Sequence, residues 1–194
     1  NQSYKTATSG LPDSSNKTYS FYWGEYGTDQ TGITNYDKVD GSNDFGFLKP
    51  EQDPYKGTPY LPDDVSSWTN GALSDWDGKA NSNVLKGVTT GGGSYTSYAT
   101  AGHVLNTFLA SADAKGYDDW YIPSCGQLSL IYMYLISVNN ALLAIGGQPL
   151  DTRYYWASSE HSSNSGWIVL FNNGRTFTRY KRLTSSVRFV RDIE

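Results

Sequence analysis

The side chains that most often carry covalent catalysis are scarce in this chain. Cys125 is the single cysteine, and His103 and His161 are the two histidines. A thiol at a helix start can become a thiolate nucleophile, because the helix N-terminus lowers its pKa. Nothing in the spacing, however, assembles a nucleophile, a base and an orienting acid. We therefore interpret Cys125 as a small buried residue beside a capping serine, and we predict no catalytic residue.

Oxygen ligands for a metal ion could come from acidic residues in the loops. The candidates are Asp63, Asp64, Asp75, Asp77, Asp118 and Asp119. Their spacing is not that of an EF-hand, so we expect solvated loop acids and helix or turn caps. One cysteine and two histidines are too few for a Cys/His-rich zinc site. The sequence thus predicts no metal site and no cofactor, with a structural Ca²⁺ left open in the acidic N-terminal half.

Cationic and aromatic residues alternate near the C-terminus. In a strand, the side chains at positions 175, 177, 179 and 181 would share one face. Arg and Tyr suit recognition because they offer large contact areas and strong hydrogen bonds at a modest ordering cost. The equal alternative is a solvated edge strand whose charges prevent pairing with a neighbour. The candidate ligand-binding residues are Tyr154, Glu160, His161, Asn164, Arg175, Phe177, Arg179, Tyr180, Lys181 and Arg182.

Composition and charge argue against two classes of protein. Charged residues make up only 18% of the 194 residues, while aromatic residues reach 15%. No apolar run approaches the ~20 residues that span a bilayer, so we do not expect a membrane-embedded chain. The net charge of −4 combines 12 acidic and 5 basic residues in 1–78 with 7 acidic and 10 basic residues in 79–194. Because the pI is about 5.1, a nucleic-acid partner is not expected.

The first half of the chain is polar and rich in turn residues. Residues 1–18 show no apolar periodicity, and we interpret them as a flexible tether. In residues 19–75, frequent Gly and Pro predict loops and short strands. Gly91-Gly92-Gly93 lacks the Gly-Lys-Ser/Thr ending of a phosphate-binding loop, so residues 87–94 are interpreted as a flexible connection.

Apolar spacing predicts two helices in the middle of the chain. The first covers roughly residues 97–115. The second begins after Ser124, which has the capping-box spacing with Gln127, and ends at Gly146. Its sequence is apolar enough that we expect it to be mostly buried.

The last third of the chain is strand-like. Short apolar or β-branched runs predict strands near residues 154–157, 166–171, 176–180 and 186–191, and Asn173-Gly174 predicts a two-residue hairpin turn. Predicted core side chains are Trp120, Trp156, Trp167, Val169, Val187 and Val190. Loops and short strands, two helices and a strand meander together predict one α+β domain over residues 19–194.

Five blocks of residues, taken in order, resemble a known family. The blocks are Trp76-x-Gly78-Lys79-Ala80-Asn81; Gly116-Tyr117-x-x-Trp120 to Ser124 with Gln127-Leu128; Tyr155 to Glu160; Trp167 to Phe171 with Asn173-Gly174; and Val187-Arg188-x-Val190-Arg191. Over about residues 72–192 they resemble the C-terminal domains of bacterial collagen-like adhesins. Residues 76–194 would then be the family-like core and 19–75 a loop-rich elaboration.

The resemblance implies a C-type-lectin-like fold, with two helices packed on a twisted antiparallel sheet and long loops. That fold is shared with the variable proteins of diversity-generating retroelements, so changeable side chains would lie on the C-terminal strands and loops. Calcium-dependent sugar binding is not expected. Gln148-Pro149 is followed by Leu150, which cannot ligate a hard cation, and no Trp-Asn-Asp strand occurs.

The leading hypothesis is a non-catalytic extracellular binding or adhesion module, secreted or anchored at the outer membrane. It would belong to a larger surface protein or a processed lipoprotein. The loop 160–165 and the hairpin 175–183 would recognise a host or environmental glycan, including an anionic one, or a protein receptor. The alternative is a structural or tip subunit of a pilus, fibre or phage tail. An enzyme would require a pocket with a strongly perturbed titratable group.

Overall fold

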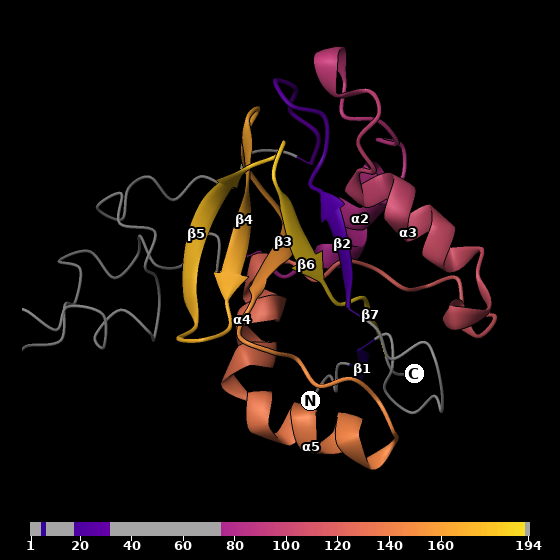
Figure 1. Cartoon of the computed structure of the whole chain (residues 1–194), viewed down its shortest axis with the longest axis vertical. Coiled ribbons are helices and arrows are strands. Elements are labelled where there is room, and N and C mark those ends of the chain that lie inside the picture. Colours follow the sequence, from indigo (N-terminus) through magenta and orange to yellow (C-terminus); the bar gives the residue numbers. More distant parts are fainter. Residues whose placement is uncertain (1–4, 7–17, 32–74, 193–194) are drawn as a thin grey trace, which may run out of the picture.

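A five-stranded sheet forms the centre of the molecule (Figure 1). The computed structural model describes residues 5–6, 18–31 and 75–192. The strand order is β2-β6-β3-β4-β5. Neighbouring strands are antiparallel except β3 and β6, which are joined by a parallel bridge between Tyr155 and Ser186. The strands are β2 Tyr19–Tyr22, β3 Tyr154–Ser162, β4 Ser165–Leu170, β5 Arg175–Tyr180 and β6 Thr184–Val187.

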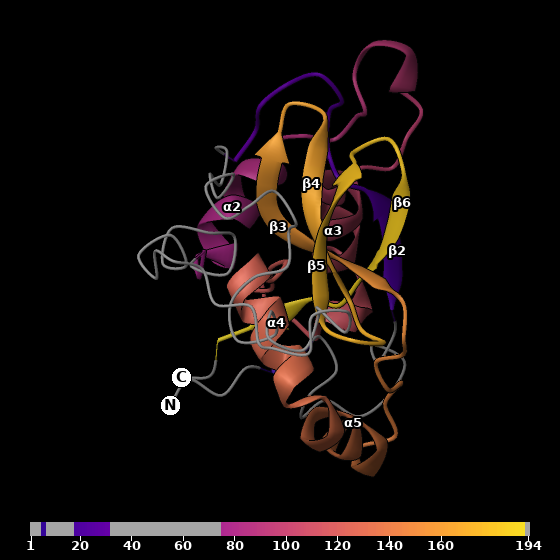
Figure 2. The ribbon, with the colours of Figure 1, turned by 90° about the vertical axis from the view of Figure 1, so that its left-hand side faces the viewer.

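Helices pack around this sheet. Helix α2 (Gly78–Leu85) packs against β3, and α3 (Ala101–Leu109) packs beside β2. Helix α4 (Cys125–Met133) packs against β3 and β4, and α5 (Leu135–Ala144) continues from it at the lower end of the molecule (Figures 1 and 2). Two short 3₁₀ turns, η3 (Gly93–Tyr95) and η4 (Ala112–Ala114), flank α3. The described part is therefore an α+β fold, as the sequence predicted. Its sheet is mixed and mostly antiparallel, whereas the resemblance implied an antiparallel sheet.

The core consists of two apolar clusters. Adjacent residues of a strand point to opposite faces of the sheet. Trp156 and Ile168 accordingly pack in the cluster of α2 and α3, whereas Tyr155 and Trp167 pack in the cluster of α4. The side chains predicted for the core are all buried: Trp120, Trp156, Trp167, Val169, Val187 and Val190.

A second, two-stranded sheet joins the two ends of the described chain. Strand β1 (Lys5–Thr6) pairs antiparallel with β7 (Val190–Arg191), with Lys5 opposite Arg191. Strand β1 lies inside the predicted tether of residues 1–18, so this part of the tether pairs with the fold. The rest of that segment up to residue 17, and residues 32–74 of the predicted elaboration, lie outside the described residues.

The predicted helices are shorter than expected. Helix α3 begins only after Thr100, whose side chain accepts a hydrogen bond from the His103 backbone, and it ends at Leu109. The predicted second helix is two helices, because the backbone of Tyr134 leaves the helical region and α4 and α5 bend by 78° there. Periodicity alone missed this break, since no Gly or Pro marks it.

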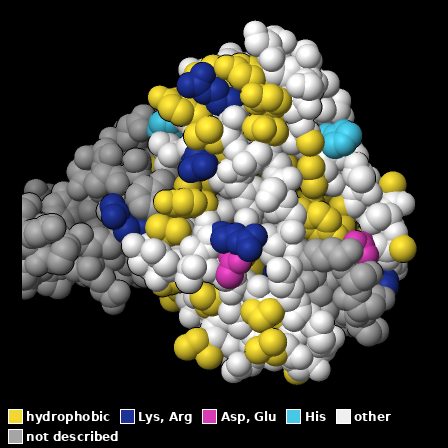
Figure 3. All heavy atoms as spheres, in the orientation of Figure 1, with side chains coloured by type: hydrophobic (Ala, Val, Ile, Leu, Met, Phe, Trp, Pro, Cys, Tyr) yellow, Lys and Arg dark blue, Asp and Glu magenta, His cyan; other side chains and the backbone are white. Residues whose placement is uncertain are grey.

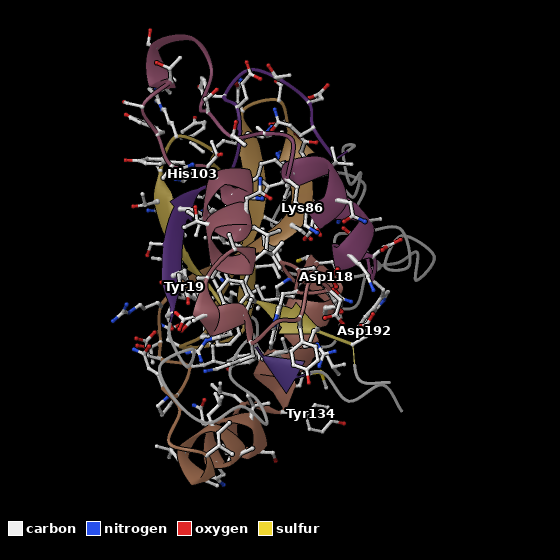
Figure 4. The ribbon with its side chains drawn as sticks, turned by 90° about the vertical axis from the view of Figure 1, so that its right-hand side faces the viewer. Tyr19, Lys86, His103, Asp118, Tyr134 and Asp192 are labelled. Carbon is white, nitrogen blue, oxygen red and sulfur yellow. The ribbon has the colours of Figure 1, made fainter. Side chains whose placement is uncertain are left out.

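The expectation that this second helix is mostly buried is wrong for α5. Of its ten residues only Leu142 is buried, and the Ile136 side chain is 79% exposed. Figure 4 shows the Tyr134 side chain at the bend between α4 and α5. In the described part of the chain no single helix is long and apolar enough to cross a membrane. Only α4 and α5 taken together, with the 78° bend between them, have the length and apolar composition of a membrane-spanning segment.

The predicted β4–β5 hairpin is present, with a longer turn than expected. Leu170 pairs with Arg175, so four residues, Phe171 to Gly174, connect the strands. Gly174 has φ +75° and donates its backbone N–H to the Leu170 carbonyl at 2.8 Å. The Asn-Gly pair therefore supplies the positive φ that the sequence pattern predicted.

Candidate ligand-binding surface

A buried ion pair lies beneath the predicted ligand face. Glu160 on β3 and Lys181 after β5 are both 0% exposed, and Lys181 Nζ lies 2.5 Å from Glu160 Oε1. Lys181 Nζ also donates to the Thr28 carbonyl at 2.7 Å and to Gln30 Oε1 at 3.1 Å. Glu160 accepts further hydrogen bonds from the backbone N–H groups of Gln30 and Thr31. Both charges are thus fully partnered inside the protein.

This arrangement corrects the prediction that Glu160 and Lys181 contact a ligand. A ligand at the surface cannot reach either side chain. Burial lowers the pKa of Lys181, and the hydrogen bond and charge of Glu160 oppose that shift. The pair instead fixes residues 24–31 to β3 and to the turn after β5. The role of these two residues is to position the neighbouring loop.

Above the ion pair, tyrosine side chains form a continuous row at the end of the sheet. We call this set the tyrosine row; it consists of Tyr22, Tyr98, Tyr95, Tyr26 and Tyr180. The rings of Tyr22 and Tyr98 are stacked with centroids 3.9 Å apart. Tyr26 makes edge contacts with Tyr95 at 5.7 Å and with Tyr180 at 6.4 Å. Every member is partly or fully exposed, so the row presents aromatic faces and edges to solvent.

Arg182 contacts three members of this row. Its guanidinium carbon lies 5.2 Å from the Tyr26 ring centre and 5.3 Å from that of Tyr180. One guanidinium nitrogen donates to the Tyr95 hydroxyl at 3.3 Å. Cation–π contacts of this kind hold an exposed arginine in place without cancelling its charge.

Two loops that the sequence analysis did not assign to the site supply most of the row. Tyr26 follows Trp23, whose indole N–H donates to the Ala157 carbonyl at 2.7 Å and anchors the loop. Tyr95 and Tyr98 follow the glycine run, in which Gly91 accepts a hydrogen bond from the Tyr26 backbone at 3.2 Å. A Cβ on Gly92 would lie 2.4 Å from the Glu25 side chain. The glycines permit close packing, and the predicted flexible connection is a packed turn.

On the other side of Tyr180 the surface is hollowed. This hollow, which we call the Arg179 hollow, has a volume of about 510 Å³ and is lined by His161, Ser165, Thr178, Arg179, Tyr180 and Leu183. The guanidinium carbon of Arg179 lies 5.3 Å from the ring centre of Tyr154. Tyr154 and Thr184 line a second, shallower hollow of about 370 Å³. In Figure 3 basic side chains alternate with hydrophobic ones over this face of the molecule.

The structure brings five of the predicted ligand residues together and separates others. Tyr154, His161, Arg179, Tyr180 and Arg182 lie on or beside the two hollows and the tyrosine row. Asn164 lies in the β3–β4 turn, where its carbonyl accepts the Lys181 N–H. Arg175 lies at the opposite end of β5, paired with Leu170. The side chain of Phe177 lies outside the described part.

The single thiol has the environment of a core residue. Cys125 is 0% exposed, and its backbone N–H donates to Ser159 Oγ at 2.9 Å. Burial raises the pKa of the thiol, and the nearby Asp75 carboxylate raises it further. His103 lies on the exposed side of α3 (Figure 4), far along the chain from His161 on β3. These positions agree with our interpretation of Cys125 as a buried structural residue.

Acidic residues in the described segments serve as caps and hydrogen-bond acceptors. Asp77 accepts the Ala80 N–H at 2.9 Å and caps α2, and Asp119 pairs with Arg191 at 2.9 Å. Asp75 accepts hydrogen bonds from Asn81 and Ser159. Within residues 18–31 and 75–192, no group of three or more His, Cys, Asp or Glu side chains could hold a metal ion. Asp63 and Asp64 lie outside the described residues.

Comparison with known proteins gives one informative likeness. No protein-family model matches the chain, and no curated protein matches it. A solved structure of a fimbrial protein from Bacteroides ovatus is similar in fold, with a TM-score of 0.54 at 15% sequence identity. The alignment covers 92% of this chain and 35% of the fimbrial protein. The chain therefore spans about a third of the length of that fimbrial protein.

Proposed function

We propose that this domain is an extracellular recognition module that binds a saccharide through the tyrosine row. The observation that supports the proposal most directly is the continuous contact of five tyrosine rings and Arg182 on an exposed surface. Such rings combine an apolar face with a polar hydroxyl. The apolar C–H face of a sugar ring can stack on them, while its hydroxyl groups exchange hydrogen bonds with Tyr and Arg.

The contacts that fix the tyrosine row in one conformation support a role in ligand binding. Exposed aromatic side chains that are loosely held pay an ordering cost when they bind a ligand. Here the Glu160–Lys181 pair fixes the loop that carries Tyr26, and the packed glycine turn fixes Tyr95. The aromatic surface is therefore preorganised in the free protein, which favours affinity.

The likeness to a fimbrial protein supports a place on the cell surface or outside the cell. The C-type-lectin-like assignment and the relationship to collagen-like adhesins remain part of this proposal. Both are compatible with an α+β domain whose recognition surface lies on loops at one end of a sheet.

Binding to a saccharide array, followed by isothermal titration with the best oligosaccharide, tests the proposal. We expect Tyr26→Ala and Tyr180→Ala each to weaken binding by at least about fivefold, since truncating a central contact aromatic costs more than about 1 kcal/mol. Tyr134→Ala is the matched control, because Tyr134 is 59% exposed but lies at the α4–α5 bend. Absence of any saccharide ligand, or wild-type affinity of both row variants, would refute the function.

A second candidate is a structural or tip subunit of a surface fibre, and α5 supports it. Residues 120–150 contain no Asp, Glu, Lys, Arg or His, and the end of α4, the bend and α5 leave large apolar side chains exposed. These are Met133, Tyr134, Ile136 and Leu143. An exposed apolar patch commonly marks a protein–protein contact. Light scattering at micromolar concentration tests this candidate: Ile136→Lys should abolish any assembly seen with the wild type, and a strictly monomeric wild type excludes it.

A further inference from the structure

Arg179, like Arg182, has no acidic partner among the described residues, unlike several other cationic side chains. Arg153 pairs with Asp151, Arg191 pairs with Asp119, and Lys181 is buried against Glu160. Within the described residues, no carboxylate lies within ion-pair distance of Arg179. Its charge is therefore not cancelled by a neighbouring side chain.

Most of the hydrogen-bonding capacity of Arg179 is also unused. A guanidinium offers five N–H donors in a fixed planar fork. One Nη of Arg179 donates to the Thr184 carbonyl over a long distance of 3.4 Å. Its Nε is buried and has no hydrogen-bond partner. A ligand cannot reach this nitrogen, so the donors left for a ligand are those of the two Nη groups, which are not among the buried atoms.

The setting of Arg179 has the size and polarity of a small-ligand site. The Arg179 hollow, at about 510 Å³, lies in the range of roughly 300–1,000 Å³ seen for such sites. Tyr180 forms its wall and also ends the tyrosine row, so a saccharide on the row can extend into the hollow. Across Arg179, the second hollow beside Tyr154 offers room for a further sugar unit.

We propose that Arg179 binds the carboxylate of an acidic saccharide, a uronic-acid unit, whose ring stacks beside Tyr180. A planar carboxylate matches the guanidinium fork and can accept from its two Nη groups together. This proposal rests on the proposed function and adds the ligand class to it. The proposal also accounts for an arginine at this position of β5, where a neutral polar residue would be solvated equally well.

The test compares three oligosaccharides of equal length by isothermal titration: an oligogalacturonate, its neutral galactose counterpart and a sulfated neutral form. We expect the wild type to bind the oligogalacturonate at least about tenfold more tightly than the neutral form, as two charge-assisted hydrogen bonds would give. Arg179→Gln should remove this preference, so that the oligogalacturonate binds no more tightly than the neutral form. Arg179→Lys should restore only part of it, because an ammonium lacks the planar fork.

Lys86→Gln is the matched control, because it removes one positive charge on the side of the molecule seen in Figure 4. It should keep the full preference. Equal binding of acidic and neutral sugars by the wild type would overturn the Arg179 assignment while leaving saccharide binding intact. Equal or tighter binding of the sulfated form, lost in Arg179→Gln, would overturn the choice of carboxylate. If none of the three binds, the Arg179 assignment fails, whereas the saccharide array decides the proposed function separately.

Discussion

The ammonium group of Lys181 contacts the carboxylate of Glu160 at a point where neither side chain reaches solvent. Removing one partner of a buried pair leaves an uncompensated charge in the interior, which typically costs about 3–5 kcal/mol. We therefore expect Lys181→Met to lower the free energy of unfolding by that amount in urea denaturation. Lys86→Met, which changes a lysine on the surface, should lie within about 0.5 kcal/mol of the wild type.

The double variant Glu160→Gln/Lys181→Met makes the same prediction sharper. With both charges gone, the interior holds no unpaired ion, so the double variant should be more stable than Lys181→Met alone. If the two single changes simply add, the pair does not interact in the way the structure shows. Because the pair fixes the loop that carries Tyr26, saccharide affinity should fall in Lys181→Met even where the protein remains folded.

Gly102 is the point at which α3 approaches the chain after α2 most closely. A Cβ at this position would lie 2.0 Å from the Leu85 carbonyl oxygen and 2.6 Å from that of Val88. Both atoms belong to the backbone and cannot move without displacing a helix. Gly102→Ala should therefore lower the thermal midpoint and cost about 1–3 kcal/mol, despite the higher helix propensity of alanine.

Gly87→Ala is the control for that substitution. Its Cβ would meet only the Val84 carbonyl oxygen at 3.4 Å, an ordinary contact. We expect no loss of stability, or a small gain from the restricted unfolded chain. A thermal midpoint for Gly102→Ala equal to that of Gly87→Ala would contradict the close approach of α3.

The Cys125 thiol should be unreactive in the folded protein. It is fully buried, and burial raises its pKa, so the thiolate needed for reaction is scarce. An aromatic disulfide reagent at pH 8 should release no colour from the native chain and one equivalent after unfolding in urea. Rapid modification before unfolding would show that the thiol is accessible and would reopen a role for it in chemistry.

Two tyrosines, Tyr19, which is half-buried, and Tyr155, which is buried, should make the protein sensitive to alkali. Burial, followed by hydrogen bonding to Asp113, raises the pKa of Tyr19, and burial raises that of Tyr155. In the unfolded chain both ionise near pH 10, whereas in the fold they stay protonated. The stability they contribute is complete below about pH 10 and declines as the pH rises above it.

Urea denaturation at pH 9 and at pH 11 measures this decline. Tyr19→Phe should show a smaller loss between the two pH values than the wild type, and Tyr134→Phe, with an exposed ring, should match the wild type. Absorbance at 295 nm should show these two tyrosines titrating only as the fold is lost. Their ionisation together with the exposed tyrosines would contradict the burial that the structure assigns to them.

The sequence predicted the frame well because the frame follows from local pattern. The capping box at Ser124, the positive φ of Gly174 and the buried side chain of Trp156 each depend on neighbouring residues or on simple alternation. The break at Tyr134 has no such signal. It depends on how α4 packs against the sheet, which is a tertiary property.

The site was predicted only in part, for a related reason. Arg179, Tyr180 and Arg182 were found because they lie close together in the sequence. Tyr26 lies about 70 residues before Tyr95 along the chain, and Tyr95 lies about 85 residues before Tyr180. Only folding brings the three together. Lys181 was wrongly predicted to be exposed, because nothing in the sequence around it indicates that its side chain pairs with a buried glutamate.

The pairing of β1 with β7 also determines how the domain responds to tension. Lys5 lies opposite Arg191 and Thr6 opposite Val190 in an antiparallel pair, so both chain ends leave the small sheet on the same side. A force that pulls the two ends apart acts across this ladder and parts its residue pairs one after another. Strands pulled in this direction unzip, whereas strands pulled along their length must break all their hydrogen bonds at once. We therefore expect the two-stranded sheet to open at low force, before the force acts on the five-stranded sheet and the surface formed by Tyr180 and Arg179.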